Sequence, residues 1–128
     1  METKKIVVAD DEAGIVQVMT AKLRNNGFEV FTADNGDDAF SLCCEQKPDV
    51  VVIDCQLPAI SGIELAEKTH KIEGLNEISF IWITEIETEI SDKQLEKAGI
   101  NERMNKPFSP KELLSKVESV LASAATTK

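Results

Sequence analysis

An apolar stretch near the start of the chain runs directly into three carboxylates. Residues 6–9 (IVVA) are typical of a strand that enters a core, and Asp10, Asp11 and Glu12 follow without a break. Carboxylates this close repel one another, and their burial is costly unless a cation neutralises them. Clustered carboxylate oxygens are also the ligands that Mg²⁺ or Mn²⁺ prefers. The stretch therefore predicts a divalent-metal site.

A further acid, Asp54, ends the apolar run VVVID at residues 50–54. If its strand lies beside the first strand, its carboxylate joins the same cluster. Aspartate can also act as a nucleophile and form an acyl phosphate. Phosphoryl transfer needs positive charge around the equatorial oxygens, which a metal and Lys106 would supply, and Thr84 would add a hydroxyl donor. One carboxylate of the cluster is thus a candidate phosphoryl acceptor.

The elements that must position these side chains alternate along the chain. The VVVI run does not alternate in polarity, as expected of a strand covered on both faces of a parallel sheet. Strand-like runs alternating with helical patterns predict an α/β fold with right-handed crossovers, in which reactive groups gather at the carboxyl ends of the strands. The expected strands are 6–9, 30–33, 50–54, 78–84 and a weaker one at 102–105, and the expected helices are 13–26, 37–46, 62–72, 86–98 and 110–121.

The last helical pattern has the clearest beginning. Ser109, followed by Pro110 and by Glu112, predicts an N-cap, a first helical residue and a capping-box partner. A short polar stretch follows the apolar stripe of this helix. We therefore expect one domain over residues 1–121 and a polar C-terminal tail over 122–128.

Together these motifs resemble the receiver domains of two-component response regulators, such as the single-domain chemotaxis and sporulation regulators. The similarity runs from residue 4 to about residue 121 and rests on several segments. These are VVADDE at 7–12, VVVIDCQLPAISG at 50–62, IWIT at 81–84 and NKPFSPKELL at 105–114.

The resemblance implies a fold and a function. The fold would be a doubly wound, flavodoxin-like parallel sheet of five strands in the order 2-1-3-4-5, with helices on both faces. Asp54 would accept a phosphoryl group from a sensor histidine kinase or a histidine phosphotransfer protein, and Thr84 and Lys106 would contact the phosphoryl oxygens. The chain would be a signalling module rather than an enzyme.

The resemblance also implies a metal site and a switch. Asp11, Asp54 and the backbone carbonyl of Gln56 would ligate Mg²⁺ (or Mn²⁺), and Asp10 would assist through a water. The new charge on the acceptor would rearrange the face formed by the fourth helix, fifth strand and fifth helix. That face would signal to a downstream protein or a fused output domain, and the resemblance leaves open whether the chain stands alone.

Two departures from the family pattern lie beside the expected site. Glu85 follows the threonine, where a small residue is usual, and its carboxylate would repel an incoming phosphoryl group or pair with Lys106, unless it points to solvent. Gln56 and Ile86 occupy positions that modulate how water attacks the acyl phosphate. Because Ile86 cannot orient a water, we expect slow spontaneous dephosphorylation.

A third departure concerns the switch. Arg103 stands where the family typically has Tyr or Phe, and the chain contains no tyrosine. Arginine is a poor core residue, so we expect it to stay outside or to pair with an acid of the 86–98 helix, such as Glu87 or Glu89. Switching through an inward-moving aromatic side chain is therefore not expected.

Three alternatives compete with a phosphorylated receiver. A dehalogenase-like phosphatase with an aspartate nucleophile needs a second acid two residues later, where this chain has Gln56. A flavin-binding module needs a loop rich in Ser, Thr or Gly after the first strand, where this chain has acids that repel phosphate. A receiver-like docking module that is never phosphorylated stays open.

Composition narrows the partners and the location. The net charge of −9 argues against direct binding to nucleic acid and suits a cation or a basic partner. We expect neither a membrane span nor a signal peptide, because the apolar runs are short and no long one follows the N-terminal lysines. Cys43, Cys44 and Cys55 form no CxxC motif, so we expect free thiols in the cytoplasm.

Overall fold

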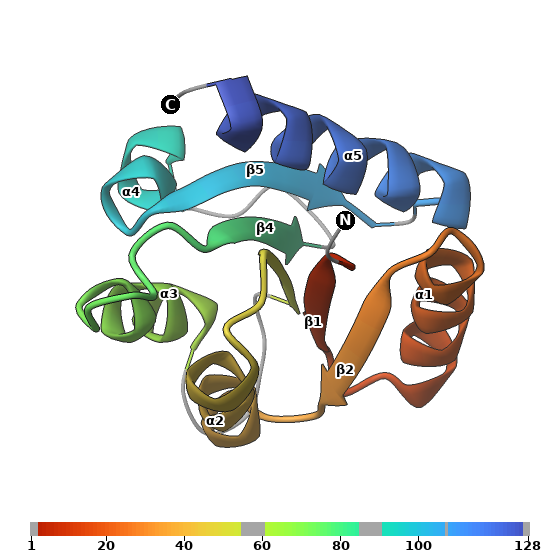
Figure 1. Ribbon diagram of the computed structural model, residues 1–128, viewed down its shortest axis with the longest axis horizontal. Helices are drawn as coiled ribbons and strands as arrows, with labels where there is room; N and C mark the ends of the chain where they lie inside the picture. Colours follow the sequence, from red (N-terminus) through yellow and green to blue (C-terminus); the bar gives the residue numbers. More distant parts are fainter. Residues whose placement is uncertain (1–2, 55–60, 85–90, 107, 127–128) are drawn as a thin grey trace.

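Strands and helices alternate through the whole computed structural model, which describes residues 3–54, 61–84, 91–106 and 108–126. This is the expected α/β pattern, and Figure 1 shows its elements in chain order. The strands are β1 (Lys5–Ala9), β2 (Glu29–Ala33), β3 (Val50–Asp54), β4 (Ser79–Thr84) and β5 (Ile100–Asn105), and the helices are α1 (Ala13–Asn25), α2 (Gly36–Gln46), α3 (Gly62–His70), α4 (Asp92–Lys97) and α5 (Pro110–Thr126).

The strands form one parallel sheet in the order β2-β1-β3-β4-β5, which confirms the predicted order. The two central neighbours β1 and β3 pair from Ile6 opposite Val50 to Ala9 opposite Ile53. Strand order therefore reverses beside β1, and the carboxyl ends of β1 and β3 lie next to each other. In such sheets, this is where a ligand site forms.

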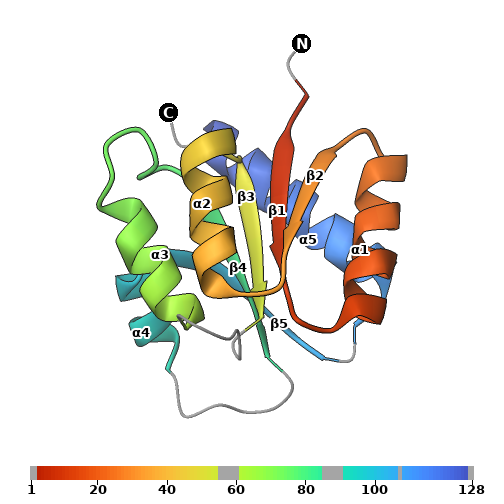
Figure 2. The same ribbon diagram turned by 90° about the horizontal axis from the view of Figure 1, so that it is seen from below.

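Helices cover both faces of the sheet, with α1 and α5 on one face and α2, α3 and α4 on the other (Figures 1 and 2). Alternate residues of each central strand enter the two cores. In β3, for example, Val51 and Ile53 pack with the α2–α3–α4 layer, and Val50 and Val52 pack with the α1–α5 layer. Burial on both faces explains why the VVVI run is apolar throughout.

Polar caps begin most of the helices. The side chains of Asn35, Ser61 and Ser91 accept a backbone N–H at the start of α2, α3 and α4. The capping box predicted for α5 is present, because the Glu112 N–H donates to Ser109 Oγ and the Ser109 N–H donates to Glu112 Oε1, both at 3.1 Å. Such caps satisfy backbone donors that have no partner within the helix.

Some boundaries differ from the sequence pattern. In the described residues α4 begins only at Asp92, because Ser91 is extended and forms a capping box with Gln94; residues 86–90 of the expected helix lie outside the described part. Helix α3 ends at His70 rather than at residue 72. Helix α5 continues to Thr126, into the segment expected to be a tail.

The packing of α3 against the sheet depends on a glycine. A Cβ added to Gly62, the first residue of α3, would lie 2.6 Å from the ring of Trp82 in β4. Trp82 is only 1% exposed and cannot give way easily. Gly62 therefore lets the start of α3 approach the carboxyl end of the sheet.

None of the described helices has the length and apolar character that a bilayer span needs.

Candidate functional site

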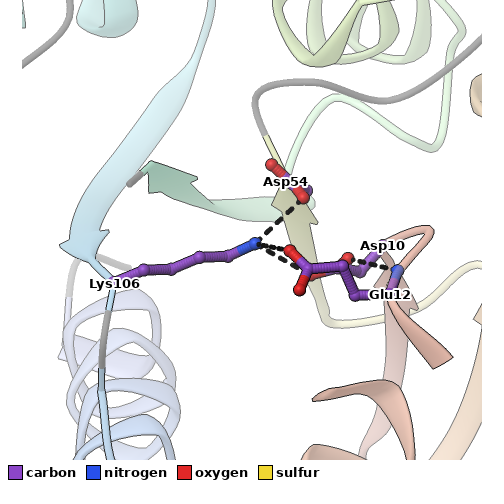
Figure 3. A network of polar contacts seen from close by, with 4 residues as sticks. All are labelled: Asp10, Glu12, Asp54 and Lys106. Carbon is purple, nitrogen blue, oxygen red and sulfur yellow. Dashed lines mark hydrogen bonds and ion pairs between the residues drawn. The ribbon is translucent and has the colours of Figure 1, made fainter. Parts of the chain in front are cut away.

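Two buried aspartates lie at the carboxyl ends of neighbouring strands. Asp10 follows β1 and is 2% exposed, and Asp54 is the last residue of β3 and is 5% exposed. The β1–β3 pairing places both carboxylates at the same edge of the sheet. Figure 3 shows them facing a common space together with Glu12 and Lys106.

Lys106 brings a positive charge to this edge from β5. Its backbone N–H donates to the carbonyl oxygen of Thr84 at 2.7 Å, which holds the residue beside the end of β4. Its side chain then reaches across, and Nζ donates to Glu12 Oε1 at 2.8 Å and to Asp54 Oδ2 at 3.2 Å (Figure 3). Nζ also lies 3.7 Å from Asp10 Oδ2. One ammonium group thus faces three carboxylates.

Thr84 lies at the same edge. It is the last residue of β4, is 2% exposed and stands in register with Asn105, the residue before Lys106. The structure therefore brings together Asp10, Asp54, Thr84 and Lys106 at the ends of β1, β3, β4 and β5.

The electrostatics of Asp10 reflect its surroundings. Burial raises the pKa of Asp10 from 3.8 to about 6, and the charges of Asp54 and Glu12 add to the rise. The backbone N–H of Glu12, which donates to Asp10 Oδ1 at 2.9 Å, and the charge of Lys106 act in the opposite direction. Asp10 Oδ2 is buried and has no hydrogen-bond partner among the described residues.

The surroundings of Lys106 favour its charged form, whereas those of Asp10 disfavour the carboxylate. Burial alone would lower its pKa, but the hydrogen bonds to Glu12 and Asp54, together with the charges of Asp10 and Asp54, outweigh that effect. The pKa of Lys106 therefore lies above its ordinary value. The ammonium is a permanent positive charge at neutral pH.

The residues of this edge fit a hard divalent cation. One carboxylate oxygen from each of Asp10, Glu12 and Asp54 lies within 4.8 Å of the others. Carboxylate oxygens suit Mg²⁺ or Mn²⁺. The buried Asp10 Oδ2 accepts no hydrogen bond from the described residues, and a bound cation would neutralise its charge instead. The predicted acidic cluster is therefore present.

The carboxylates that lie together in the described residues are Asp10, Glu12 and Asp54. Asp11 is exposed and is not among the grouped carboxylates, whereas Glu12, which belongs to the acidic stretch but not to the ligand set that the resemblance implies, is grouped with Asp10 and Asp54. A signal for Glu12 existed, because residues two apart in an extended segment share a side. By that rule the sequence places Glu12 on the same side of the chain as Asp10.

Some predicted site residues cannot be compared with the structure. Gln56, Glu85 and Ile86 lie outside the described residues, so their predicted roles stay predictions.

Arg103 lies on β5 and pairs with α4. Its Nη1 donates to Asp92 Oδ1 at 2.6 Å, so the expected pairing with an acid near α4 is present, with Asp92 as the partner. Glu87 and Glu89, the partners named as examples from the sequence, lie outside the described residues. Arg103 is part of the β5–α4 packing rather than of the acidic cluster.

A buried aspartate pair and a lysine at the switch point of a 2-1-3-4-5 sheet define a receiver-like protein. The sequence model of the response regulator receiver domain matches residues 6–118. The chain therefore belongs to the response regulator receiver domain family of two-component systems, which confirms the resemblance seen in the sequence.

Individual relatives agree. The chain is 35% identical over 121 residues to the phosphate regulon transcriptional regulatory protein PhoB of Pseudomonas aeruginosa, covering 94% of this chain and 53% of PhoB. The chain thus spans about half the length of that curated relative.

Solved structures show the same fold. A CheY-like receiver domain protein from Methanospirillum hungatei has a TM-score of 0.90 at 24% identity, with 99% of this chain and 100% of that chain covered. The receiver domain of sensor histidine kinase PA1611 from P. aeruginosa has a TM-score of 0.83 at 23% identity, with 94% of this chain and 99% of that chain covered. The latter structure holds a magnesium ion in its active-site cleft.

Proposed function

We propose that Asp54 is the phosphoryl acceptor of this receiver domain. The observation that carries the proposal is the contact between Lys106 Nζ and Asp54 Oδ2 at 3.2 Å, at the edge where Asp10 and Glu12 add negative charge. Asp54 is the buried carboxylate that directly ends a central strand, and a cation already lies beside it. A buried aspartate is a competent nucleophile only when such charge is available to the group it receives.

In the proposed reaction, a phosphoryl group moves from a phosphohistidine to Asp54. A carboxylate oxygen of Asp54 attacks the phosphorus of a phosphohistidine, and the new P–O bond forms as the P–N bond breaks. The electron pair of the broken bond leaves with the histidine nitrogen, which takes up a proton from solvent. Lys106 Nζ stabilises the negative charge on the phosphoryl oxygens, and we assign a second donor role to the Thr84 hydroxyl.

The metal requirement is part of the proposal. Asp10 and Asp54 would hold Mg²⁺ or Mn²⁺, and Asp11 and the Gln56 carbonyl are proposed as further ligands from the family resemblance. When bound, the ion supplies positive charge that compensates the charge on the phosphoryl oxygens. The clustered oxygens of Asp10, Glu12 and Asp54 support this assignment.

The proposed partners follow from this chemistry. The phosphoryl donor is a sensor histidine kinase or a histidine phosphotransfer protein, and the output is a downstream protein or a fused output domain. We place the protein in the cytoplasm, which the free thiols of Cys43 and Cys44 support. We propose no direct contact of this domain with nucleic acid, given its net charge of −9.

The test is intact-mass analysis after incubation with acetyl phosphate. With Mg²⁺ present, the wild-type chain gains the mass of one phosphoryl group, and Asp54→Ala gains none. Removal of Mg²⁺ with EDTA abolishes the gain in the wild type. Absence of a gain in the wild type would support the docking module that is never phosphorylated, and catalytic release of phosphate would support the phosphatase.

A further inference from the structure

The shortest contact of the Lys106 ammonium in this site is with Glu12, not with the proposed acceptor. Nζ lies 2.8 Å from Glu12 Oε1 and 3.2 Å from Asp54 Oδ2. The Lys106 side chain is only 10% exposed, whereas that of Glu12 is 48% exposed. The lysine is thus held between a carboxylate at the surface and a carboxylate in the interior.

Glu12 is at the N-cap position of α1, where a side chain usually accepts a hydrogen bond from the helix. It is the N-cap residue of α1, with extended backbone angles of φ −92° and ψ 99°, yet its side chain accepts no hydrogen bond from the helix. N-cap side chains usually satisfy one of the first free N–H groups of the helix. The Glu12 carboxylate is instead directed to Lys106 (Figure 3).

We propose that Glu12 is a positioning residue that holds Lys106 back in the unphosphorylated protein and so limits the rate at which Asp54 is phosphorylated. This inference rests on the proposed function of Asp54. While Glu12 binds the ammonium, Lys106 is shared and is not fully directed at the space that the phosphoryl group will occupy. Glu12 acts on the reaction through Lys106 and does not itself touch the phosphoryl group.

The net charge of the site also supports the proposal. Three carboxylates and one ammonium give the group Asp10, Glu12, Asp54 and Lys106 a formal charge of −3 + 1 = −2. Small phosphodonors are anions, and the negative charge of this cluster opposes the attraction that a bound divalent ion and Lys106 would supply. Neutralising Glu12 reduces the repulsion and releases the ammonium to the oxygens of the donor.

The test measures the rate of phosphorylation by acetyl phosphate with Mg²⁺, followed by intact mass. In this reaction an Asp54 oxygen forms a P–O bond as the acyl O–P bond of the donor breaks, and acetate leaves with the electron pair. Glu12→Gln keeps the side-chain shape and removes the charge. We expect it to react about three- to tenfold faster than the wild type. Glu118→Gln, which removes an exposed acid from α5, is the matched control and should stay within about twofold.

A double-mutant cycle separates positioning from charge alone. In a Lys106→Met background Glu12 has no ammonium to bind and Glu12→Gln can act only by lowering the negative charge, so it should accelerate the reaction less than it does in the wild-type background. An equal acceleration with and without Lys106, or no acceleration by Glu12→Gln in the wild-type background, would overturn the proposal.

A second measurement keeps the pairing testable if the Lys106→Met proteins react too slowly. In metal-free buffer, Glu12→Gln should lower the urea midpoint more, or raise it less, in the wild-type background than in the Lys106→Met background. The reason is that only the wild type loses an ion pair. Equal shifts would show that the pair does not form in solution and would overturn the proposal. If the wild type gains no mass but the effect of Glu12→Gln on the urea midpoint differs between the two backgrounds, the ion pair exists and the proposed function of Asp54 has failed.

Discussion

Asp10 is the residue whose charge state should respond to pH near neutrality. It is buried beside Asp54 and Glu12, and its pKa rises to about 6 because burial and these charges disfavour the carboxylate. The folded protein therefore holds the Asp10 proton more tightly than the unfolded chain does. Asp10 favours folding fully below its unfolded pKa near 3.8, and this contribution is lost as pH rises through about 6.

Asp10→Asn should reveal this contribution in metal-free buffer. The amide oxygen can still accept the Glu12 N–H, but it cannot ionise. Between pH 4 and pH 7 the free energy of unfolding of the variant should rise relative to the wild type by roughly 1 to 3 kcal/mol. Urea denaturation at each pH measures the difference, and a difference that does not grow with pH would contradict the assignment.

In addition to the two apolar cores, specific contacts join the elements around the site. The start of α3 approaches β4 closely because Gly62 leaves room for the ring of Trp82. On the neighbouring strand β5, Arg103 pairs with Asp92 at the start of α4. We expect substitutions at these two contacts to change the free energy of unfolding by different amounts.

Gly62→Ala should destabilise the protein. The added methyl group would lie 2.6 Å from the buried Trp82 ring, and overpacking of this kind costs about 1 to 3 kcal/mol. Gly14→Ala in α1 is the matched control, because a Cβ there meets nothing within 4 Å and alanine favours the helix by about 0.5 to 1 kcal/mol. Opposite shifts in the urea midpoint are expected, and equal shifts would refute the close packing.

Asp92→Asn should have a small effect. Asp92 is 84% exposed and Arg103 is 32% exposed, so water and salt screen their ion pair. We expect a loss of less than about 1 kcal/mol in the free energy of unfolding, and a smaller loss in 1 M NaCl. A loss well above that, relative to Glu96→Gln on the same helix, would mean that the pair supports β5 more strongly than its exposure indicates.

At the scale of the whole molecule, the sequence predicted the fold well. Each central strand enters two cores, so its apolar pattern is unbroken and easily recognised. Placing Asp10, Asp54, Thr84 and Lys106 at one edge then followed from the topology of parallel sheets.

The remaining details depend on tertiary contacts that periodicity does not contain. The turn of the chain after β1 decides that Glu12, and not Asp11, faces Lys106. The cap at Ser91 decides where α4 begins, although apolar residues before it favoured a longer helix. Asp92, the first residue of α4, lies within reach of Arg103, which periodicity does not predict.

A divalent ion should stabilise the whole domain. An ion that binds only the folded protein relieves the repulsion between Asp10, Glu12 and Asp54, and it adds about 1.4 kcal/mol to the free energy of unfolding at ten times its Kd. Urea denaturation with MgCl₂, compared with NaCl of equal ionic strength, measures the gain. Asp54→Ala should lose it and Glu118→Gln should keep it; an equal gain in Asp54→Ala would exclude the proposed site.

The most direct test of the account is the chemical identity of the phosphorylated residue. Borohydride reduces an aspartyl phosphate to homoserine, which tandem mass spectrometry can locate in the sequence after treatment with acetyl phosphate and Mg²⁺. We predict homoserine at position 54 and at no other position. Homoserine at position 10 or 11, 5-hydroxynorvaline (the reduction product of a glutamyl phosphate) at position 12, or neither product in a folded protein, would contradict the assignment of Asp54 as the acceptor.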